Sequence, residues 1–159
     1  MKFCLLVQLL SSCAKDLYLM AELFRIAWID SKQKIIPNKS LSGLLSVRVF
    51  LLVIECSLYG MENVMEYAAG FFIGGGMFLL CYLVTKGGLG AGDVKLFAVL
   101  GLYLGSRRIF TAAFLSVFFA AVYTGIKALL RRTNWKKEIP LGPFVFLGTA
   151  AAIILERQG

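Results

Sequence analysis

Long apolar runs separated by short polar or glycine-rich stretches occupy nearly the whole chain. Hydrophobic residues make up 59% of the 159 residues and only 16% are charged, whereas a soluble domain carries about a quarter charged residues. A helix of about 20 apolar residues spans the hydrocarbon core of a bilayer. The sequence therefore predicts an all-α, polytopic membrane protein with about six transmembrane helices in one domain, residues 1–159.

Six apolar segments can be distinguished, with approximate bounds 1–29, 41–59, 64–84, 93–105, 109–130 and 139–155. The first is the least regular, because Lys15 and Asp16 interrupt its middle. A helix that crosses the roughly 30 Å core must carry this charged pair inward, so we expect a broken or tilted first helix. Its start also resembles a lipoprotein signal peptide ending at Cys13, but cleavage there would leave too short a segment before residue 30.

Charged residues also occur inside the second segment, where Arg48 and Glu55 lie on one helical face. They are seven residues apart, which we expect to be too far for a direct pair along the helix. We therefore predict that both side chains point into the bundle and pair with other helices. Further along the chain, residues 106–108 (Ser-Arg-Arg) are predicted to form the loop between the fourth and fifth segments.

The chain carries a formal net charge of +8. Its basic residues fall mainly in loops and form no continuous basic face with interleaved aromatic residues, so nucleic-acid binding is not expected. Basic loops of membrane proteins stay on the cytoplasmic side, which places loops 31–40, 85–92 and 131–138 there. This topology brings Asp30, at the end of the first segment, and Asp93, at the start of the fourth, to one side of the membrane at similar depth.

Histidine is absent from the chain. Its absence excludes Ser-His-Asp and Cys-His nucleophilic systems and every His-ligated metal site. The four cysteines contain no C-x-x-C pair, which leaves little support for a zinc or redox site. We therefore expect neither a metal nor a cofactor, and any catalysis must use carboxylates, hydroxyls, thiols or lysines.

Asp30 and Asp93 are the strongest candidates for such chemistry. Only three aspartates occur in the chain, and these two sit where an apolar segment meets a polar loop. A carboxylate at the edge of the lipid costs free energy and marks a functional site by default. Two neighbouring carboxylates share one proton, so that one acts as general base and the other as general acid in peptide hydrolysis. The plainer alternative for Asp93 is that it caps the following helix.

Gly90 and Gly92 precede Asp93 in the sequence Gly-Ala-Gly-Asp. Glycine permits unusual backbone angles and lets another backbone approach closely, so we expect both residues to line a path for an extended peptide. A single G-x-G-D motif is a weak signal, and it gains weight from the second aspartate at the same depth.

Three separated motifs together resemble the type IV prepilin peptidase family. In the first, Asp30 is followed seven residues later by Pro37 and Asn38. The second is Gly-Ala-Gly-Asp-Val-Lys over residues 90–95, and the third is Ile-Pro-Leu-Gly-Pro-Phe over residues 139–144. Their order and spacing make the resemblance specific.

The resemblance implies an aspartic endopeptidase of the G-x-G-D type with Asp30 and Asp93 as its catalytic pair. Residues that would support the site or bind substrate are Pro37, Asn38, Gly90, Gly92, Lys95, Gly142 and Pro143. Because Lys95 lies only two residues after Asp93, we do not expect it to contact that carboxylate directly. Anchoring to lipid headgroups is the plain alternative for Lys95.

The resemblance also implies a substrate and a cellular location. The substrate would be a type IV prepilin or pseudopilin, whose short basic leader is cut just before an apolar helix. The enzyme would be a multi-pass protein of the cytoplasmic membrane of a prokaryote, in contact with lipid and with its active site facing the cytoplasm. The sequence leaves open whether the chain forms a homo-oligomer.

Larger bacterial members of the family carry an additional N-terminal region that is linked to methylation of the new pilin N-terminus. Because the sequence begins without such a region, we expect cleavage without methyl transfer, as in short Tad-type or archaeal preflagellin peptidases. Two alternatives remain open. One is a membrane transporter or scaffold that uses the two aspartates as proton or cation sites. The other is a general presenilin-like intramembrane protease, which the spacing of Pro37 and Asn38 disfavours.

Overall fold

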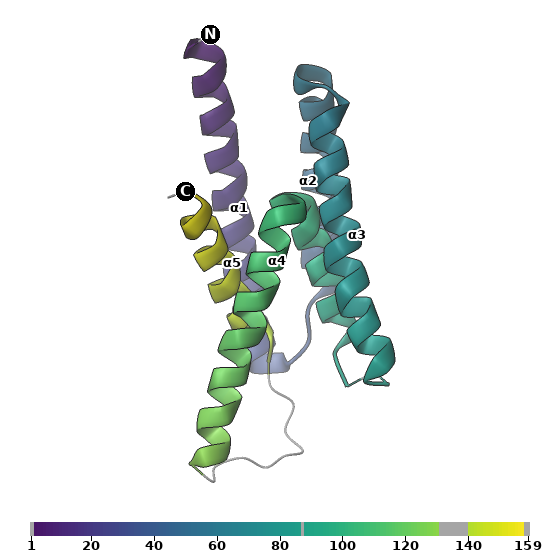
Figure 1. Ribbon diagram of the computed structural model, residues 1–159, viewed down its shortest axis with the longest axis vertical. Coiled ribbons are helices and arrows are strands. Elements are labelled where there is room, and N and C mark those ends of the chain that lie inside the picture. Colours follow the sequence, from purple (N-terminus) through teal and green to yellow (C-terminus); the bar gives the residue numbers. More distant parts are fainter. Residues whose placement is uncertain (1, 87, 131–139, 158–159) are drawn as a thin grey trace.

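The computed structural model describes residues 2–86, 88–130 and 140–157 (Figure 1). These residues form no strand, and their helices are α1 (Lys2–Gln33), α2 (Asn38–Tyr59), α3 (Met61–Val84), α4 (Ala91–Leu129) and α5 (Gly142–Arg157). Three of the helices hold stretches long and apolar enough to cross a membrane, namely Asn38–Ser57, Val64–Val84 and Ala91–Leu129. The prediction of an all-α, polytopic membrane protein is confirmed.

α1 is one unbroken helix of 32 residues, so the prediction of a break in the first segment is wrong. An ion pair accommodates the charge at its centre, because the Lys15 ammonium contacts the Glu55 carboxylate of α2. Both side chains are largely buried, with 16% and 13% of their surface exposed. A buried charge with a partner costs much less free energy than an isolated one, so the helix continues through Lys15.

α4 reverses direction at Gly105, where φ is 78° and ψ is 177°. Its two halves, residues 91–104 and 106–129, run in roughly opposite directions from this turn (Figure 1). Only glycine adopts such a φ at low cost, so one residue makes the whole turn. The fourth and fifth predicted segments are both helical, but the prediction of a loop at residues 106–108 is wrong.

α3 packs closely against both halves of α4 because glycines lie at the contact. A Cβ atom added to Gly101 would overlap the Gly70 carbonyl group. A Cβ atom added to Gly74 would lie 2.5 Å from the Phe97 carbonyl oxygen and 2.9 Å from Cγ1 of Ile109. Because these glycines lack side chains, the backbones of α3 and α4 approach each other closely. This packing holds the helix that carries Asp93 in a defined position.

Arg48 of α2 is fully buried and links this helix to α4. Its Nε atom donates a 2.6 Å hydrogen bond to the Leu102 carbonyl, in the last turn before the reversal of α4. The last carbonyls of a helix lack intrahelical partners, so this bond satisfies one of them and places a positive charge at the negative end of the helix dipole.

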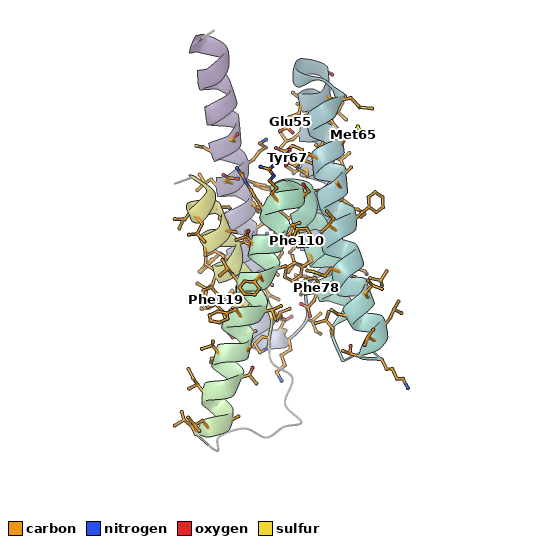
Figure 2. All side chains as sticks on the ribbon, in the orientation of Figure 1. Glu55, Met65, Tyr67, Phe78, Phe110 and Phe119 are labelled. Atoms are coloured by element: carbon orange, nitrogen blue, oxygen red, sulfur yellow. The ribbon has the colours of Figure 1, made fainter. Side chains whose placement is uncertain are left out.

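Arg48 also pairs within its own helix. Its Nη1 atom lies 3.2 Å from the Glu55 carboxylate, and its guanidinium lies 4.2 Å from the centre of the Tyr67 ring. Figure 2 shows Glu55 and Tyr67 together in the upper half of the bundle. The long arginine side chain bridges two helical turns, so the prediction that Arg48 and Glu55 are too far apart to pair is wrong. The prediction that they also pair with other helices is confirmed through Lys15 and Leu102.

The helix directions bring two of the predicted cytoplasmic loops to one end of the bundle. Residues 31–40 and the described part of residues 85–92 lie in the lower half of Figure 1, opposite the turn between α2 and α3. The third loop of that group, residues 131–138, falls outside the described residues.

Candidate functional site: two carboxylates in one cavity

Asp30 lies in the last turn of α1 and is only 5% exposed. Its Oδ2 atom accepts a 2.7 Å hydrogen bond from the backbone N–H of Gly142, the first residue of α5. N–H groups in the first turn of a helix lack intrahelical acceptors, so this carboxylate caps α5 from another helix. Burial raises the pKa of the Asp30 carboxyl above its ordinary value, and the hydrogen bond from Gly142 partly offsets this rise.

Asp93 lies in the first turn of α4, whose N-cap residue is Gly90. Its side chain lines the same cavity as that of Asp30, where two negative charges would repel each other. The first turn of a helix favours a carboxylate electrostatically, so this position is compatible with a capping role. Capping alone gives no reason for a second buried carboxylate beside it, because like charges at close range disfavour the ionised pair.

Both aspartates line a single cavity of about 320 Å³. Its walls come from the end of α1, the link into α2 and the start of α4. The lining residues are Asp30, Lys34, Ile35, Ile36, Asn38, Gly90, Ala91, Gly92, Asp93 and Lys95. A water molecule takes up about 30 Å³ of the liquid, so the cavity has room for several waters or a short piece of peptide. The fold thus brings the two predicted aspartates together with four of the residues predicted to support them.

Gly90 and Gly92 keep the cavity open by lacking side chains. The expected unusual backbone angles are absent at both, since Gly90 has a φ of −66° and a ψ of 134°, and Gly92 lies within α4. A Cβ atom at Gly90 would lie 3.0 Å from Oδ2 of Asp93, and one at Gly92 would lie 3.1 Å from Cβ of Ile36. Both separations are shorter than ordinary van der Waals contact, so a larger residue would press on the cavity wall.

Pro37 and Asn38 end the link between α1 and α2. Pro37 is the N-cap residue of α2, with a φ of −69° and a ψ of 121°, and it lies outside the lining of the cavity. Asn38 follows as the first residue of α2 and lines the cavity. Pro37 therefore directs the chain into the helix that begins with Asn38.

Lys34 and Ile36 also line the cavity, although neither was predicted from the sequence. Lys34 has a φ of 53°, a left-handed conformation that turns the chain out of α1 into the link to α2. Its amide donates a 2.8 Å hydrogen bond to the Asp30 carbonyl. The only signal in the sequence for a role of Lys34 at the cavity was its position, one helical turn after the candidate aspartate Asp30.

Lys95 and Pro143 occupy different places relative to the cavity. Lys95 is exposed and lines it, and no ion pair within the described part of the chain joins it to Asp93. Pro143 lies apart, in a separate groove of about 270 Å³ with Phe24, Trp28 and other residues of α1 and α5.

Within the described ranges, no three Cys, Asp or Glu side chains are grouped as they would be to hold a metal ion.

Gly142 touches the Asp30 carboxylate so closely that one added methyl group should disturb it. A Cβ atom at Gly142 would lie 2.9 Å from Oδ2 of Asp30 and 3.2 Å from Cα of Ala27. We expect Gly142→Ala to displace the carboxylate and to lower the activity of the site about tenfold or more, because small misplacements of catalytic groups are costly. The measurement is the rate of substrate cleavage, accompanied by thermal unfolding of the same sample.

Gly43→Ala is the matched control for Gly142→Ala. A Cβ atom at Gly43, in α2, would meet no atom within 4 Å, so this variant should keep its activity. Equal activity of the two variants would contradict the inferred contact between α5 and Asp30.

Comparison with known proteins gives consistent matches. The model of the type IV leader peptidase family matches residues 17–125. The prepilin leader peptidase/N-methyltransferase of Bacillus subtilis is 31% identical over 130 residues, which are 81% of this chain and 50% of that protein. A protein of the same name from Aeromonas salmonicida is 31% identical over 94 residues, 58% of this chain and 32% of that protein.

The chain spans half or less of the length of these curated relatives. No solved structure matches it. The range matched by the family model, residues 17–125, includes both aspartates and every residue that lines the cavity. It covers more than half of the chain, and we conclude that the chain belongs to the type IV leader peptidase family.

Proposed function

We propose that this protein is a membrane aspartic endopeptidase that removes the basic leader from type IV prepilins or pseudopilins. The observation that carries the proposal is the shared cavity, in which Asp30 of α1 and Asp93 of α4 converge from different helices. Membership of a leader peptidase family supports the reaction class. The names of the similar proteins support a prepilin as substrate.

The two carboxylates would divide the roles of base and acid between them. The Gly142 N–H donates to Asp30 and favours its ionised form, so Asp30 is the candidate base that takes a proton from a bound water. That water attacks the scissile carbonyl. Asp93, protonated because two adjacent negative charges are unfavourable, donates its proton to the carbonyl oxygen. The tetrahedral intermediate then collapses as Asp30 gives its proton to the leaving amine and Asp93 takes a proton back from a hydroxyl of the intermediate, which restores the shared-proton state of the pair.

The proposed orientation places the cavity at the cytoplasmic face of the cell membrane. The loops around it, residues 31–40 and 85–92, carry four lysines, Lys32, Lys34, Lys39 and Lys86, and basic loops favour the cytoplasmic side. A basic leader gains no long-range attraction from lysines at the entrance. The aspartates and anionic lipid headgroups must therefore supply the attraction.

The proposal covers peptide cleavage and assigns methyl transfer to none of the described residues. A transporter or scaffold role is disfavoured by membership of a peptidase family. A general presenilin-like protease would share the carboxylate chemistry, so only the position of the cut distinguishes it from the proposed enzyme.

The proposal is tested with the full chain, purified in detergent and mixed with a prepilin that carries a short basic leader and an apolar helix. We expect one cut, between the leader and the apolar helix, located by mass spectrometry of both products. A cut within the apolar helix would favour the presenilin-like alternative. If no prepilin or pseudopilin is cut, the proposed function is wrong.

A further inference from the structure

An apolar groove continues from the carboxylate cavity along the seam between α2 and the first half of α4. Its volume is about 420 Å³, and its lining residues are Asn38, Leu41, Ser42, Leu45, Phe71, Lys95, Ala98 and Val99. Two of these, Asn38 and Lys95, line the carboxylate cavity as well. The cavity and the groove therefore meet at these two side chains.

We propose that this groove binds the first apolar residues of the prepilin, those directly after the scissile bond. The inference rests on the proposed function and extends it by one subsite. Asn38 and Lys95 border both the cavity and the groove, so a polypeptide whose scissile bond lies at Asp30 and Asp93 would reach the groove past these two side chains.

The groove leads away from the polar end of the bundle. Leu45 lies seven residues beyond Asn38 in α2, and Val99 lies four residues beyond Lys95 in α4. At 1.5 Å per residue, the groove reaches about 10 Å along α2 and about 6 Å along α4. Both stretches belong to helices apolar enough to cross a membrane. The groove thus follows the direction that an apolar substrate segment takes from the membrane surface into the lipid.

The lining of the groove matches an apolar occupant and excludes a basic one. Leu41 and Val99 are buried in its walls, and Leu45, Phe71 and Ala98 add further apolar surface. Apart from Ser42, its polar side chains are Asn38 and Lys95, which also line the cavity. A basic leader would lose its hydration in the groove without gaining a partner. The apolar segment therefore occupies the groove, and the leader stays on the side of the cavity that faces water.

The first test fills the groove. Two substrates are compared, a prepilin peptide with its apolar segment and the same peptide ending two residues after the cut. Leu45→Trp should raise KM for the long substrate about tenfold and raise KM for the short one much less. Val53→Trp is the matched control, since Val53 lies on the same helix, is 62% exposed and does not line the groove. It should behave as wild type with both substrates.

The second test does not depend on the folding of a tryptophan variant. A long substrate with a photoreactive leucine analogue three residues after the cut is bound to Asp93→Asn protein and irradiated. Crosslinks to Phe71 or to residues 38–45 or 95–99 are expected, whereas crosslinks elsewhere, or to lipid alone, would overturn the proposal.

The outcomes separate the subsite from the activity. If wild type cuts both substrates and Leu45→Trp leaves KM for the long one unchanged, the groove assignment is wrong and the proposed function stands. If wild type cuts neither substrate, the proposed function is wrong and the subsite with it.

Discussion

Replacing Asp93 by asparagine is expected to reduce prepilin cleavage about a thousandfold or more, within the range attributed to general acid–base catalysis. Asparagine has nearly the shape of aspartate but neither gives nor takes a proton near neutral pH, so the cavity should persist without its chemistry. Asp30→Asn should have a similar effect. The double variant should be little worse than either single one, because the pair acts as a unit. Single-turnover cleavage rates in detergent provide the measurement.

Glu66→Gln is the control for the two aspartate variants. Glu66 is an exposed carboxylate beside the turn at Gly105 and does not line the cavity. Its removal should leave cleavage near normal. Thermal unfolding of each variant distinguishes lost chemistry from lost folding. If a folded double aspartate variant still cleaves the prepilin at the wild-type rate, the mechanism is wrong.

Replacing Arg48 by methionine is expected to have the largest effect on stability, lowering the free energy of unfolding by about 3–5 kcal/mol. The change removes the hydrogen bond to the Leu102 carbonyl and one of the two cations that contact Glu55. It leaves a buried carbonyl and a less compensated carboxylate in the apolar interior, and both are costly. Unfolding of the purified protein in a denaturing detergent measures the loss.

Arg107→Met is the matched control, because Arg107 is exposed and lies two residues after the reversal at Gly105. Arg107→Met also removes one positive charge but should change the free energy of unfolding little.

Arg48→Lys should recover only part of the stability lost in Arg48→Met, since an ammonium keeps the charge and lacks the planar guanidinium that reaches two acceptors. Equal stability of Arg48→Met and wild type would show that the buried arginine does not hold α2 to α4.

The placement of the candidate site at one end of the bundle could be predicted, because it depends on local properties of the chain. Apolar segments of known length alternate with polar loops, so the end of the first segment and the start of the fourth face the same side. Asp30 and Asp93 were singled out because charge is scarce in an apolar chain. The motifs then indicated seven further residues. Asn38, Gly90, Gly92 and Lys95 line the cavity, whereas Pro37, Gly142 and Pro143 do not.

The predictions that failed, and the residue that was missed, have causes that the local sequence pattern does not show. Lys15 and Asp16 were expected to break or tilt the first helix, but α1 is unbroken and Glu55 of α2 pairs with Lys15. Residues 106–108 look like a loop by charge alone, whereas the reversal occurs at Gly105 and leaves them helical. Lys34 lines the cavity because its backbone adopts a left-handed conformation, which hydropathy does not reveal.

By itself, the sequence determined that this protein is a helical membrane protein and which acidic residues lie at one end of it, because hydropathy and loop charge act locally along the chain. Only the tertiary structure decided which groups meet: the Asp30 carboxylate with the Gly142 amide, the Arg48 guanidinium with the Leu102 carbonyl, and Gly70 with Gly101. The physical reason is that these contacts join residues far apart in the chain, and they form only where close packing brings their helices together.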